Sequence, residues 1–157
     1  MNNSADELWW VLAIRVKLKK RSSFPFSIII NFSADDCSNY STLSDADRKR
    51  TFVTPIHGEV LCDKLLLKRW YRFEGDAGTR MPTTPVDDNH CNTVRSGWLN
   101  GAQPTMEGGE VIRTVCFTRG DNKCSYLKQI KMKNCGSYFI YKLGPLSICD
   151  SRYCGAD

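Results

Sequence analysis

The stretch Glu110-Val-Ile-Arg-Thr-Val-Cys-Phe117 has the periodicity of an extended chain and contains one of the chain's cysteines. Successive side chains of a β-strand point to opposite faces of a sheet, so the residues of such a stretch divide into two sets. The two sets are Val111, Arg113 and Val115, and Ile112, Thr114 and Cys116. The stretch therefore predicts a strand that presents a cysteine on one of its faces.

The sequence after this stretch predicts further strands. Ile130 and Met132 alternate with three polar residues over residues 129–133, which is typical of a half-buried strand. Gly136-Ser137 provides a tight turn into residues 137–143, which are rich in aromatic and β-branched types. We therefore predict a hairpin across Gly136.

The sequence before it predicts one more short strand and little helix. Residues 70–73 favour a strand that ends at Gly75 and Gly78. Ser44 followed by Asp47 is a weak capping pattern, enough for one or two helical turns. Residues 81–92 and 100–109 are rich in loop-forming types. The predicted fold class is mainly β, a small disulfide-rich antiparallel β domain with long loops and at most one or two short helices.

All eight cysteines of the 157-residue chain lie between Cys37 and Cys154. An even number of cysteines in a short stretch indicates a closed disulfide framework, and disulfides persist in oxidising compartments. Structural zinc sites instead use close pairs such as C-x-x-C. The closest cysteines here are Cys149 to Cys154 and Cys116 to Cys124. We therefore expect an extracellular chain, secreted or at the cell surface, with no metal and no cofactor.

The absence of cysteine before Cys37 predicts a boundary near Ala34, with an arm over residues 1–34 and a disulfide-linked domain over residues 35–157. The net charge is +5, with both signs mixed along the chain. A basic cluster in the arm comprises Arg15, Lys17, Lys19, Lys20 and Arg21. A nucleic-acid-binding surface would interleave such charges with stacking aromatic side chains, so no nucleic-acid partner is predicted.

The arm contains two apolar segments, residues 8–14 and residues 24–30. Neither has both the charge order and the length of a secretory signal, and neither approaches the roughly 20 apolar residues that span a bilayer. We interpret the arm as a damaged, atypical or mispredicted start, or the chain as a fragment of a longer secreted protein. The alternative is that residues 11–30 contribute ordinary strands to the fold.

The run Trp70-Tyr-Arg-Phe-Glu-Gly-Asp-Ala-Gly-Thr-Arg-Met-Pro82 resembles the signature of the eight-cysteine domain of the uromodulin, pancreatic zymogen-granule glycoprotein and oncoprotein-induced-transcript type. Other stretches fit the same family pattern in the same order: Cys37-Ser-Asn-Tyr40 with Leu43, Cys91-Asn-Thr93, Gly97-Trp-Leu-Asn-Gly101 with Pro104, Gly109-Glu-Val-Ile-Arg113, Lys133-Asn-Cys135, residues 138–143, and Tyr153-Cys154. The signature positions are Trp70, Tyr71, Arg72, Phe73, Gly75, Gly78, Met81, Pro82, Trp98, Leu99, Asn100 and Gly101.

This resemblance implies an extracellular β-rich domain of a mosaic protein, beside other extracellular modules if the chain is a fragment. It also implies a pairing, which eight cysteines alone leave open among 105 possibilities. The implied bridges are Cys37 to Cys135, Cys62 to Cys149, Cys91 to Cys154, and Cys116 to Cys124. A fifth bridge of the family's ten-cysteine version would join the positions of Pro85 and Lys123, where both cysteines are absent together.

Glycosylation is expected to differ from that of the relatives. The resemblance implies an adhesin-decoy sugar on the Trp-Leu-Asn-Gly stretch, but Asn100-Gly-Ala102 lacks the hydroxyl that the acceptor sequence needs. The decoy role therefore does not transfer to Asn100. Asn31-Phe-Ser and Asn39-Tyr-Ser make Asn31 and Asn39 the glycosylation candidates.

The two histidines, His57 and His90, are the candidate bases near neutral pH. Neither has an evident nucleophile to activate, so both are interpreted as surface loop residues. Glu74 and Asp76 are spaced to act as an acid and base, but their glycine-rich setting favours turn formation.

Asp87-Asp88 lacks the alternate oxygen ligands of a calcium loop, so both residues are interpreted as solvated. Trp70, Tyr71 and Trp98 have side chains that stack on sugars. In a small domain such residues more often form the core, because large aromatic side chains supply burial there.

The predicted function is a non-catalytic module for protein or glycan interaction, within an adhesion, matrix or mucosal defence protein. Its expected partners are extracellular proteins or glycans. The alternative is a small secreted hydrolase or defence effector. Loss of activity on changing Glu74, Asp76 or His57, with folding intact, would favour that alternative.

Overall fold

The computed structural model describes residues 36–157, so the arm of residues 1–34 and the candidate Asn31 lie outside the described part. It contains seven strands: β1 (Ser41–Leu43), β2 (Arg69–Phe73), β3 (Arg95–Asn100), β4 (Glu110–Arg119), β5 (Asn122–Asn134), β6 (Phe139–Leu143) and β7 (Ser151–Tyr153). The helical elements described are short 3₁₀ turns: η1 (Asp36–Ser38), η2 (Ala46–Arg48), η3 (Asp63–Leu65), η4 (Gly75–Ala77) and η5 (Met106–Gly108). The mainly β prediction is confirmed.

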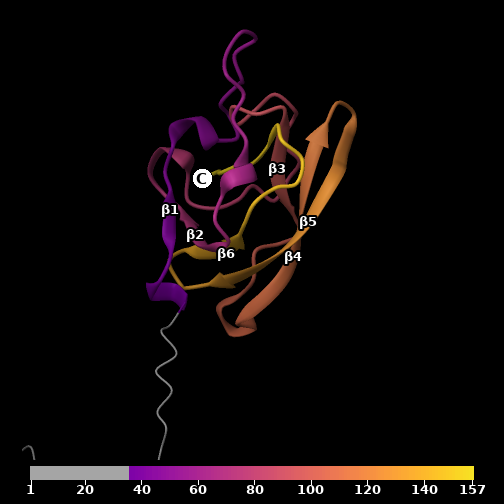
Figure 1. Cartoon of the computed structure of the whole chain (residues 1–157). Helices are drawn as coiled ribbons and strands as arrows, with labels where there is room; N and C mark the ends of the chain where they lie inside the picture. Colours follow the sequence, from indigo (N-terminus) through magenta and orange to yellow (C-terminus); the bar gives the residue numbers. More distant parts are fainter. Residues whose placement is uncertain (1–35) are drawn as a thin grey trace, which may run out of the picture. The chain divides into compact units, whose positions relative to one another are not determined.

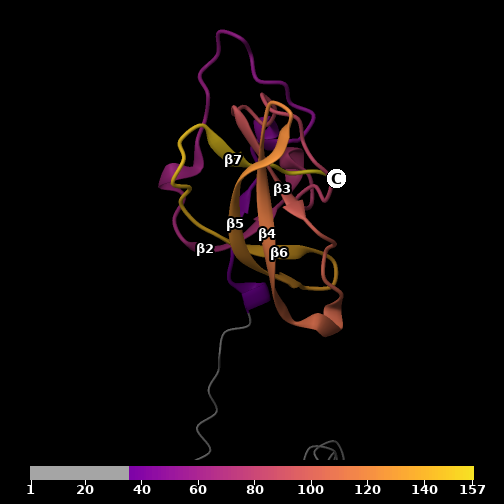
Figure 2. The same ribbon diagram turned by 90° about the vertical axis from the view of Figure 1, so that its right-hand side faces the viewer.

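The strands form one sheet in the order β1-β2-β6-β5-β4-β3-β7 (Figure 1). The five central strands pair antiparallel, as predicted, whereas β1 and β7 add in parallel at the two edges. Parallel neighbours need a long crossover, and residues 44–68 between β1 and β2 provide one that carries η2 and η3. Figure 2 shows β4 and β5 side by side as the long strands of the sheet.

The local predictions largely agree with these strands. The predicted strand 110–117 lies within β4, and the hairpin across Gly136 joins β5 to β6 in antiparallel pairing. The strand predicted at residues 129–133 extends further, because β5 pairs with β4 along most of its length. The predicted helix start at Ser44 becomes a single 3₁₀ turn, η2, with Asp45 before it.

The main core covers one face of the sheet. Alternation along β4 sends Val115 and Phe117 into this core, and Leu99 opposite Val115 on β3 joins them. Its buried members are Leu43, Tyr71, Phe73, Ala77, Met81, Leu99, Val115, Phe117, Ile130, Met132, Tyr141, Leu143, Leu146 and Tyr153. Because successive side chains of β4 point to opposite faces of the sheet, the alternation in its sequence determines which of them enter the main core.

A second, smaller apolar cluster lies on the opposite face of β3 and β4. Cys116 and its cross-strand partner Trp98 pack there with Val86 and with the half-cystines Cys91 and Cys154. The loop of residues 86–94 therefore covers a part of the sheet face that would otherwise be open to water. Two disulfides and an indole ring provide most of this cluster.

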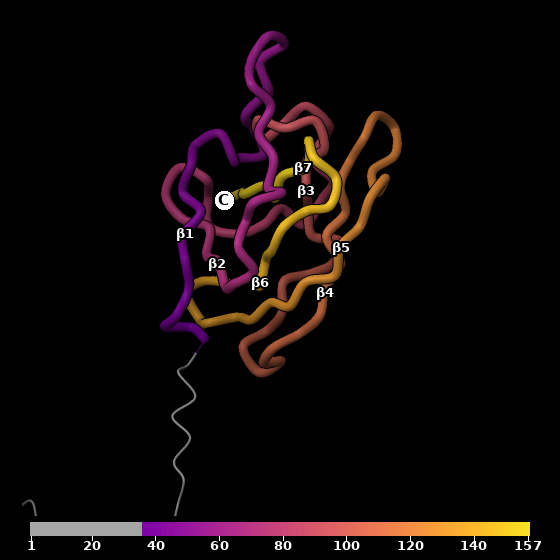
Figure 3. Tube along the Cα trace, viewed as in Figure 1, coloured from indigo at the N-terminus to yellow at the C-terminus, as the bar shows by residue number. Residues whose placement is uncertain are grey.

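The C-terminal segment packs into the fold after β7 (Figure 3). It forms isolated bridges from Gly155 to Lys49 and from Ala156 to Arg80. Residues 53–60 form the loop that projects at the top of Figure 1, with Ile56 almost fully exposed. Within residues 36–157, no helix has the length and apolarity to cross a bilayer.

Candidate functional site

Three disulfides link distant parts of the described chain. Cys37 is bonded to Cys135, Cys91 to Cys154, and Cys116 to Cys124. Each agrees with the pairing that the resemblance implies. The first joins η1 to the β5–β6 turn, and the third closes the β4–β5 hairpin. The framework therefore fixes both ends of the long hairpin.

The structure corrects the fourth implied bridge, from Cys62 to Cys149. The bridge is absent, and both residues are free thiols. Their side chains share a hydrogen bond, so the two residues do meet as the pairing requires. Two thiols in such contact differ from a disulfide by two hydrogen atoms. Although burial opposes it, hydrogen bonds from Cys149 and from backbone groups hold the pKa of Cys62 below its ordinary value. The same hydrogen bond between the two thiols raises the pKa of Cys149.

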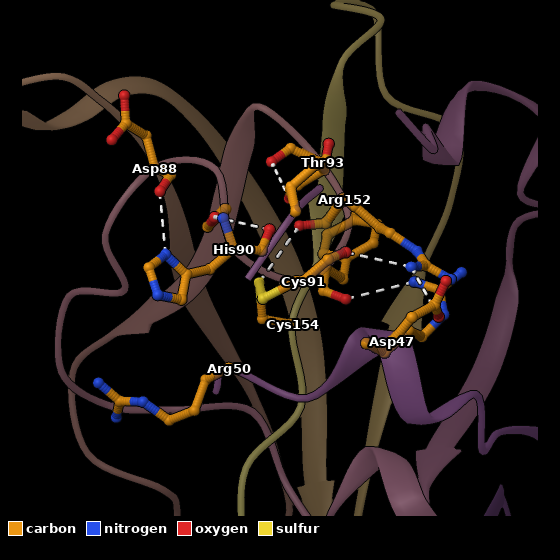
Figure 4. Close-up of a disulfide and its surroundings, with 12 residues drawn as sticks. Asp47, Arg50, Asp88, His90, Cys91, Thr93, Arg152 and Cys154 are labelled. Atoms are coloured by element: carbon orange, nitrogen blue, oxygen red, sulfur yellow. Dashed lines mark hydrogen bonds and ion pairs between the residues drawn. A yellow bond between two sulfur atoms is a disulfide. The ribbon is translucent and has the colours of Figure 1, made fainter. Parts of the chain in front are cut away.

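Polar side chains surround the Cys91–Cys154 disulfide (Figure 4). Arg152 Nη1 donates to the Cys91 carbonyl at 3.1 Å and pairs with Asp47 at 2.9 Å. His90 Nδ1 lies 2.9 Å from the Asp88 carbonyl. These contacts go to backbone groups and to one carboxylate, so they hold the loop of residues 88–93 against β7 and leave no side chain paired as a nucleophile and base.

A buried ion pair lies beside this disulfide. Arg48 Nη2 and Nη1 donate to the two carboxylate oxygens of Asp63 at 2.7 and 2.9 Å, and both side chains are almost fully buried. Asp63 also accepts from the Tyr153 N–H at 2.9 Å. Burial acts to lower the pKa of Arg48, but Asp63 and Asp45 hold it above its ordinary value. Burial and the nearby Arg48 charge lower the pKa of Arg152.

Sequence reasoning missed this network. Arg48 and Asp63 are 15 residues apart, and the Arg48 contact to the Tyr153 carbonyl spans 105 residues. No spacing rule for a helix or strand connects such positions. Only the fold brings these charges together, so local sequence carried no signal for them.

Four of the signature residues belong to the main core. Tyr71, Phe73, Met81 and Leu99 are buried in the main core, and the Met81 N–H donates to the Tyr141 hydroxyl at 3.0 Å. The signature positions without a place in that core are Trp70, Arg72, Gly75, Gly78, Pro82, Trp98, Asn100 and Gly101.

The aromatic candidates for sugar stacking are largely covered. Trp70 and Trp98 expose 6% and 7% of their surface, which agrees with the core interpretation. The Trp98 Nε1–H donates to the Lys123 carbonyl at 2.8 Å, and Lys142 Nζ lies 5.4 Å from the Trp70 ring centroid. Arg72 lies 4.2 Å from the Tyr138 ring centroid. The Trp98 hydrogen bond satisfies the polar edge of its indole, whereas the other two contacts place a cation over a ring face.

Among the turn residues of the signature, Gly75, Asn100 and Gly101 are exposed, whereas Gly78 is buried. Asn100 is exposed at the end of β3, and Gly75, Gly78 and Gly101 all have positive φ. Asn39 is also exposed, just before β1. Ser41, the hydroxyl residue of the same sequon, accepts a hydrogen bond from Arg69 Nη1 at 3.3 Å.

The candidate acids and bases do not converge in the structure. His57 is exposed in the projecting loop, and Asp76 is exposed in η4. Glu74 lies 3.8 Å from Arg72 Nε. The sequence interpretation of residues 74–78 as a turn is confirmed, since η4 occupies it.

The aspartates of the 81–92 loop have structural contacts. Asp87 forms an exposed ion pair with Lys123 at 2.7 Å, and Asp88 accepts from the Gly120 N–H at 2.9 Å. Both tie this loop to the β4–β5 turn. Across residues 36–157, no three metal-ligating side chains gather in one place.

Comparisons with known proteins give a consistent assignment. The family model described as a uromodulin-like domain matches residues 71–155. Among curated relatives, the pancreatic secretory granule membrane major glycoprotein GP2 of Canis lupus familiaris is 37% identical over 129 residues, 82% of this chain and 25% of that protein. Uromodulin of Mus musculus is 36% identical over 121 residues, 76% of this chain and 18% of that protein. The chain thus spans a quarter or less of the length of these relatives.

Proposed function

Because the chain belongs to the uromodulin-like domain family, whose relatives here are extracellular glycoproteins, we propose that it is a non-catalytic module for protein or glycan binding. Its location is extracellular. The module would work within a mosaic adhesion, matrix or mucosal defence protein, beside neighbouring extracellular modules if the chain is a fragment.

The observation that best supports this proposal is that the titratable candidate side chains are engaged in structural contacts. His90, Asp88, Asp87 and Glu74 each contact a backbone group or a cation within the described fold. Hydrolysis needs a base within hydrogen-bond reach of the proton it removes and a positioned nucleophile or water. Disulfides and buried ion pairs instead provide a rigid frame, which suits a surface that recognises a partner without changing it.

Asn39 is the glycosylation site that we propose for the described part of the chain. Its side chain is exposed beside β1, and the sequon Asn39-Tyr-Ser41 supplies the acceptor pattern. A sugar there would project into solvent without displacing a core residue. Changing Asn39 to Gln is expected to remove one glycan mass from the protein secreted by a eukaryotic cell.

The proposal is tested with secreted protein on arrays of extracellular proteins and mucosal glycans, alongside a panel of ester, peptide and glycoside substrates. Saturable binding without turnover is expected, and it should survive the combined changes His57→Ala, Glu74→Gln and Asp76→Asn. Turnover that these three changes abolish, with thermal unfolding unaltered, would instead establish the hydrolase alternative.

A further inference from the structure

A row of side chains crosses four adjacent strands on the sheet face opposite the main core. Ile112 on β4 stands opposite Lys131 on β5, Lys131 opposite Lys142 on β6, and Lys142 opposite Trp70 on β2. Directly opposite side chains are cross-strand neighbours, and two like charges in such positions destabilise the pair. Placing Lys131 beside Lys142 therefore weakens the sheet where hydrophobic or oppositely charged pairs would strengthen it.

The positive charge of this row is only partly compensated. Lys131 Nζ lies 2.6 Å from Glu110, while Lys142 Nζ lies over the Trp70 ring. Lys68, just before β2, lines the same depression of about 420 Å³ as Lys131 and Lys142. Among residues 36–157, no carboxylate pairs with Lys68 or Lys142. Two ammonium groups are thus left to interact with a ligand.

A second depression continues the first. It has a volume of about 380 Å³, shares Lys68 and Lys142 with its neighbour, and adds the exposed Arg69. Tyr40 and Ser41 supply a half-buried ring and a hydroxyl on its other side. The charged residues lining the two depressions are Lys68, Arg69, Lys131, Lys142 and Asp36, with Glu110 paired to Lys131. Positive charge predominates along the whole length.

We infer that the two depressions form one site, the lysine groove, which binds a linear sulfated polysaccharide. The inference rests on the proposed binding function and names its ligand class. Lysine ammonium groups in series match sulfate groups repeated along a chain, because each pair is an attraction between point charges. Polar groups such as Gln129 and Ser41 provide hydrogen-bond partners for sugar hydroxyls.

An acidic peptide fits this groove less well. Peptides that bind sheets usually add a strand at an edge, where backbone groups are unpaired. The row of side chains instead crosses β2, β6, β5 and β4, all of which have strands on both sides, and the edge strand β1 lines the groove through Ser41 alone. A peptide lying along this row could not extend the sheet and would depend on side chains alone. A polysaccharide has no such backbone requirement.

The test measures binding of the full chain to a heparin-type sulfated polysaccharide and to its desulfated form. The double change Lys68→Gln and Lys142→Gln should weaken binding to the sulfated form about tenfold, from two ion contacts. Changing the same two residues to Arg should preserve binding, since the charge is kept. Binding of the unaltered chain should fall as salt rises and should be lost on desulfation.

The matched control is Arg119→Gln with Lys123→Gln, which removes the same charge at the β4–β5 turn. Lys123 and Lys131 are eight residues apart on β5, about 26 Å at ~3.3 Å per residue. Affinity should be unaltered in this control. Equal losses in both doubles would show that only net charge matters, and equal binding of poly-glutamate would refute the polysaccharide. Absence of binding to any sulfated chain would refute the assignment of the lysine groove as a polysaccharide site. The proposed function would remain supported by binding on the other arrays.

Discussion

At the scale of single residues, Gly78 shows how the signature holds the C-terminal segment. Its φ is +92°, and a Cβ there would lie 2.4 Å from the backbone carbonyl of Ala156. That carbonyl accepts hydrogen bonds from the N–H groups of Thr79 and Arg80, at 2.7 and 3.1 Å. A side chain at position 78 would displace both bonds, so glycine serves here for close approach as well as for backbone freedom.

Cys62 is the residue whose reactivity the structure makes most distinctive. Hydrogen bonds lower the pKa of its thiol, whereas the pKa of the more exposed Cys149 is raised. The thiolate is the nucleophile, so the thiol with the lower pKa becomes reactive at lower pH. In protein kept mildly reduced, we predict that iodoacetamide alkylates Cys62 before Cys149 as pH is raised from neutral, as measured by peptide mass spectrometry.

Changing Cys149 to Ala provides the control for this prediction. It removes the hydrogen bond that favours the Cys62 thiolate, so alkylation of Cys62 should move to higher pH. Faster alkylation of Cys149 than of Cys62 in the unaltered chain would contradict the assignment. If neither residue reacts until strong reductant is added, the pair is a disulfide in the isolated protein.

At the scale of elements, the Arg48–Asp63 pair joins three short pieces that have little contact surface of their own. Arg48 belongs to η2, Asp63 begins η3, and the Tyr153 N–H that donates to Asp63 belongs to β7. A three-residue turn cannot hold its position by local hydrogen bonds alone. The buried charges therefore set where the crossover between β1 and β2 meets the edge strand.

Changing Asp63 to Asn is predicted to lower the free energy of unfolding by about 3–5 kcal/mol, because it leaves the buried Arg48 charge unpaired. Denaturant titration followed by tryptophan fluorescence measures this change. The control is Asp87→Asn, which breaks the exposed pair with Lys123 and should leave the midpoint nearly unchanged. Comparable losses in the two variants would show that the buried pair has no special role.

At the scale of the whole molecule, the disulfides restrict chain segments of very different length. The Cys37–Cys135 bridge spans 98 residues, whereas the Cys116–Cys124 bridge spans 8. Cross-links act largely by lowering the entropy of the unfolded chain, more for longer loops. The long bridge is therefore expected to contribute more to the stability of the fold than the short one, which closes a hairpin that is already paired.

Replacing Cys37 and Cys135 by Ser is predicted to lower the free energy of unfolding by about 4–5 kcal/mol, against about 2–3 kcal/mol for replacing Cys116 and Cys124. Urea titrations of the two double variants provide the measurement. The reverse order would mean that loss of packing around the buried Cys116 outweighs loop entropy.

The sequence by itself determined four of the strands, β2, β4, β5 and β6, together with the extracellular disulfide chemistry and the family. Alternation at residues 110–117 and the turn at Gly136 depend on neighbouring residues, so their physical cause is local. The need of a small domain for large buried side chains placed Trp70 and Trp98 in the core rather than on a sugar-stacking surface, and both are buried. Three of the four implied cysteine pairs are present in the structure. The family resemblance predicted them, because it carries long-range information that the spacing of the cysteines does not contain.

Only the tertiary structure decided which distant residues meet. Four features depend on the register between strands or on crossings of the chain. They are the parallel edge strands β1 and β7, the Arg48–Asp63 pair, the free thiols of Cys62 and Cys149, and the position of Lys131 beside Lys142. Such contacts arise from packing and loop closure over tens of residues, and no periodicity of 2 or 3.6 encodes them.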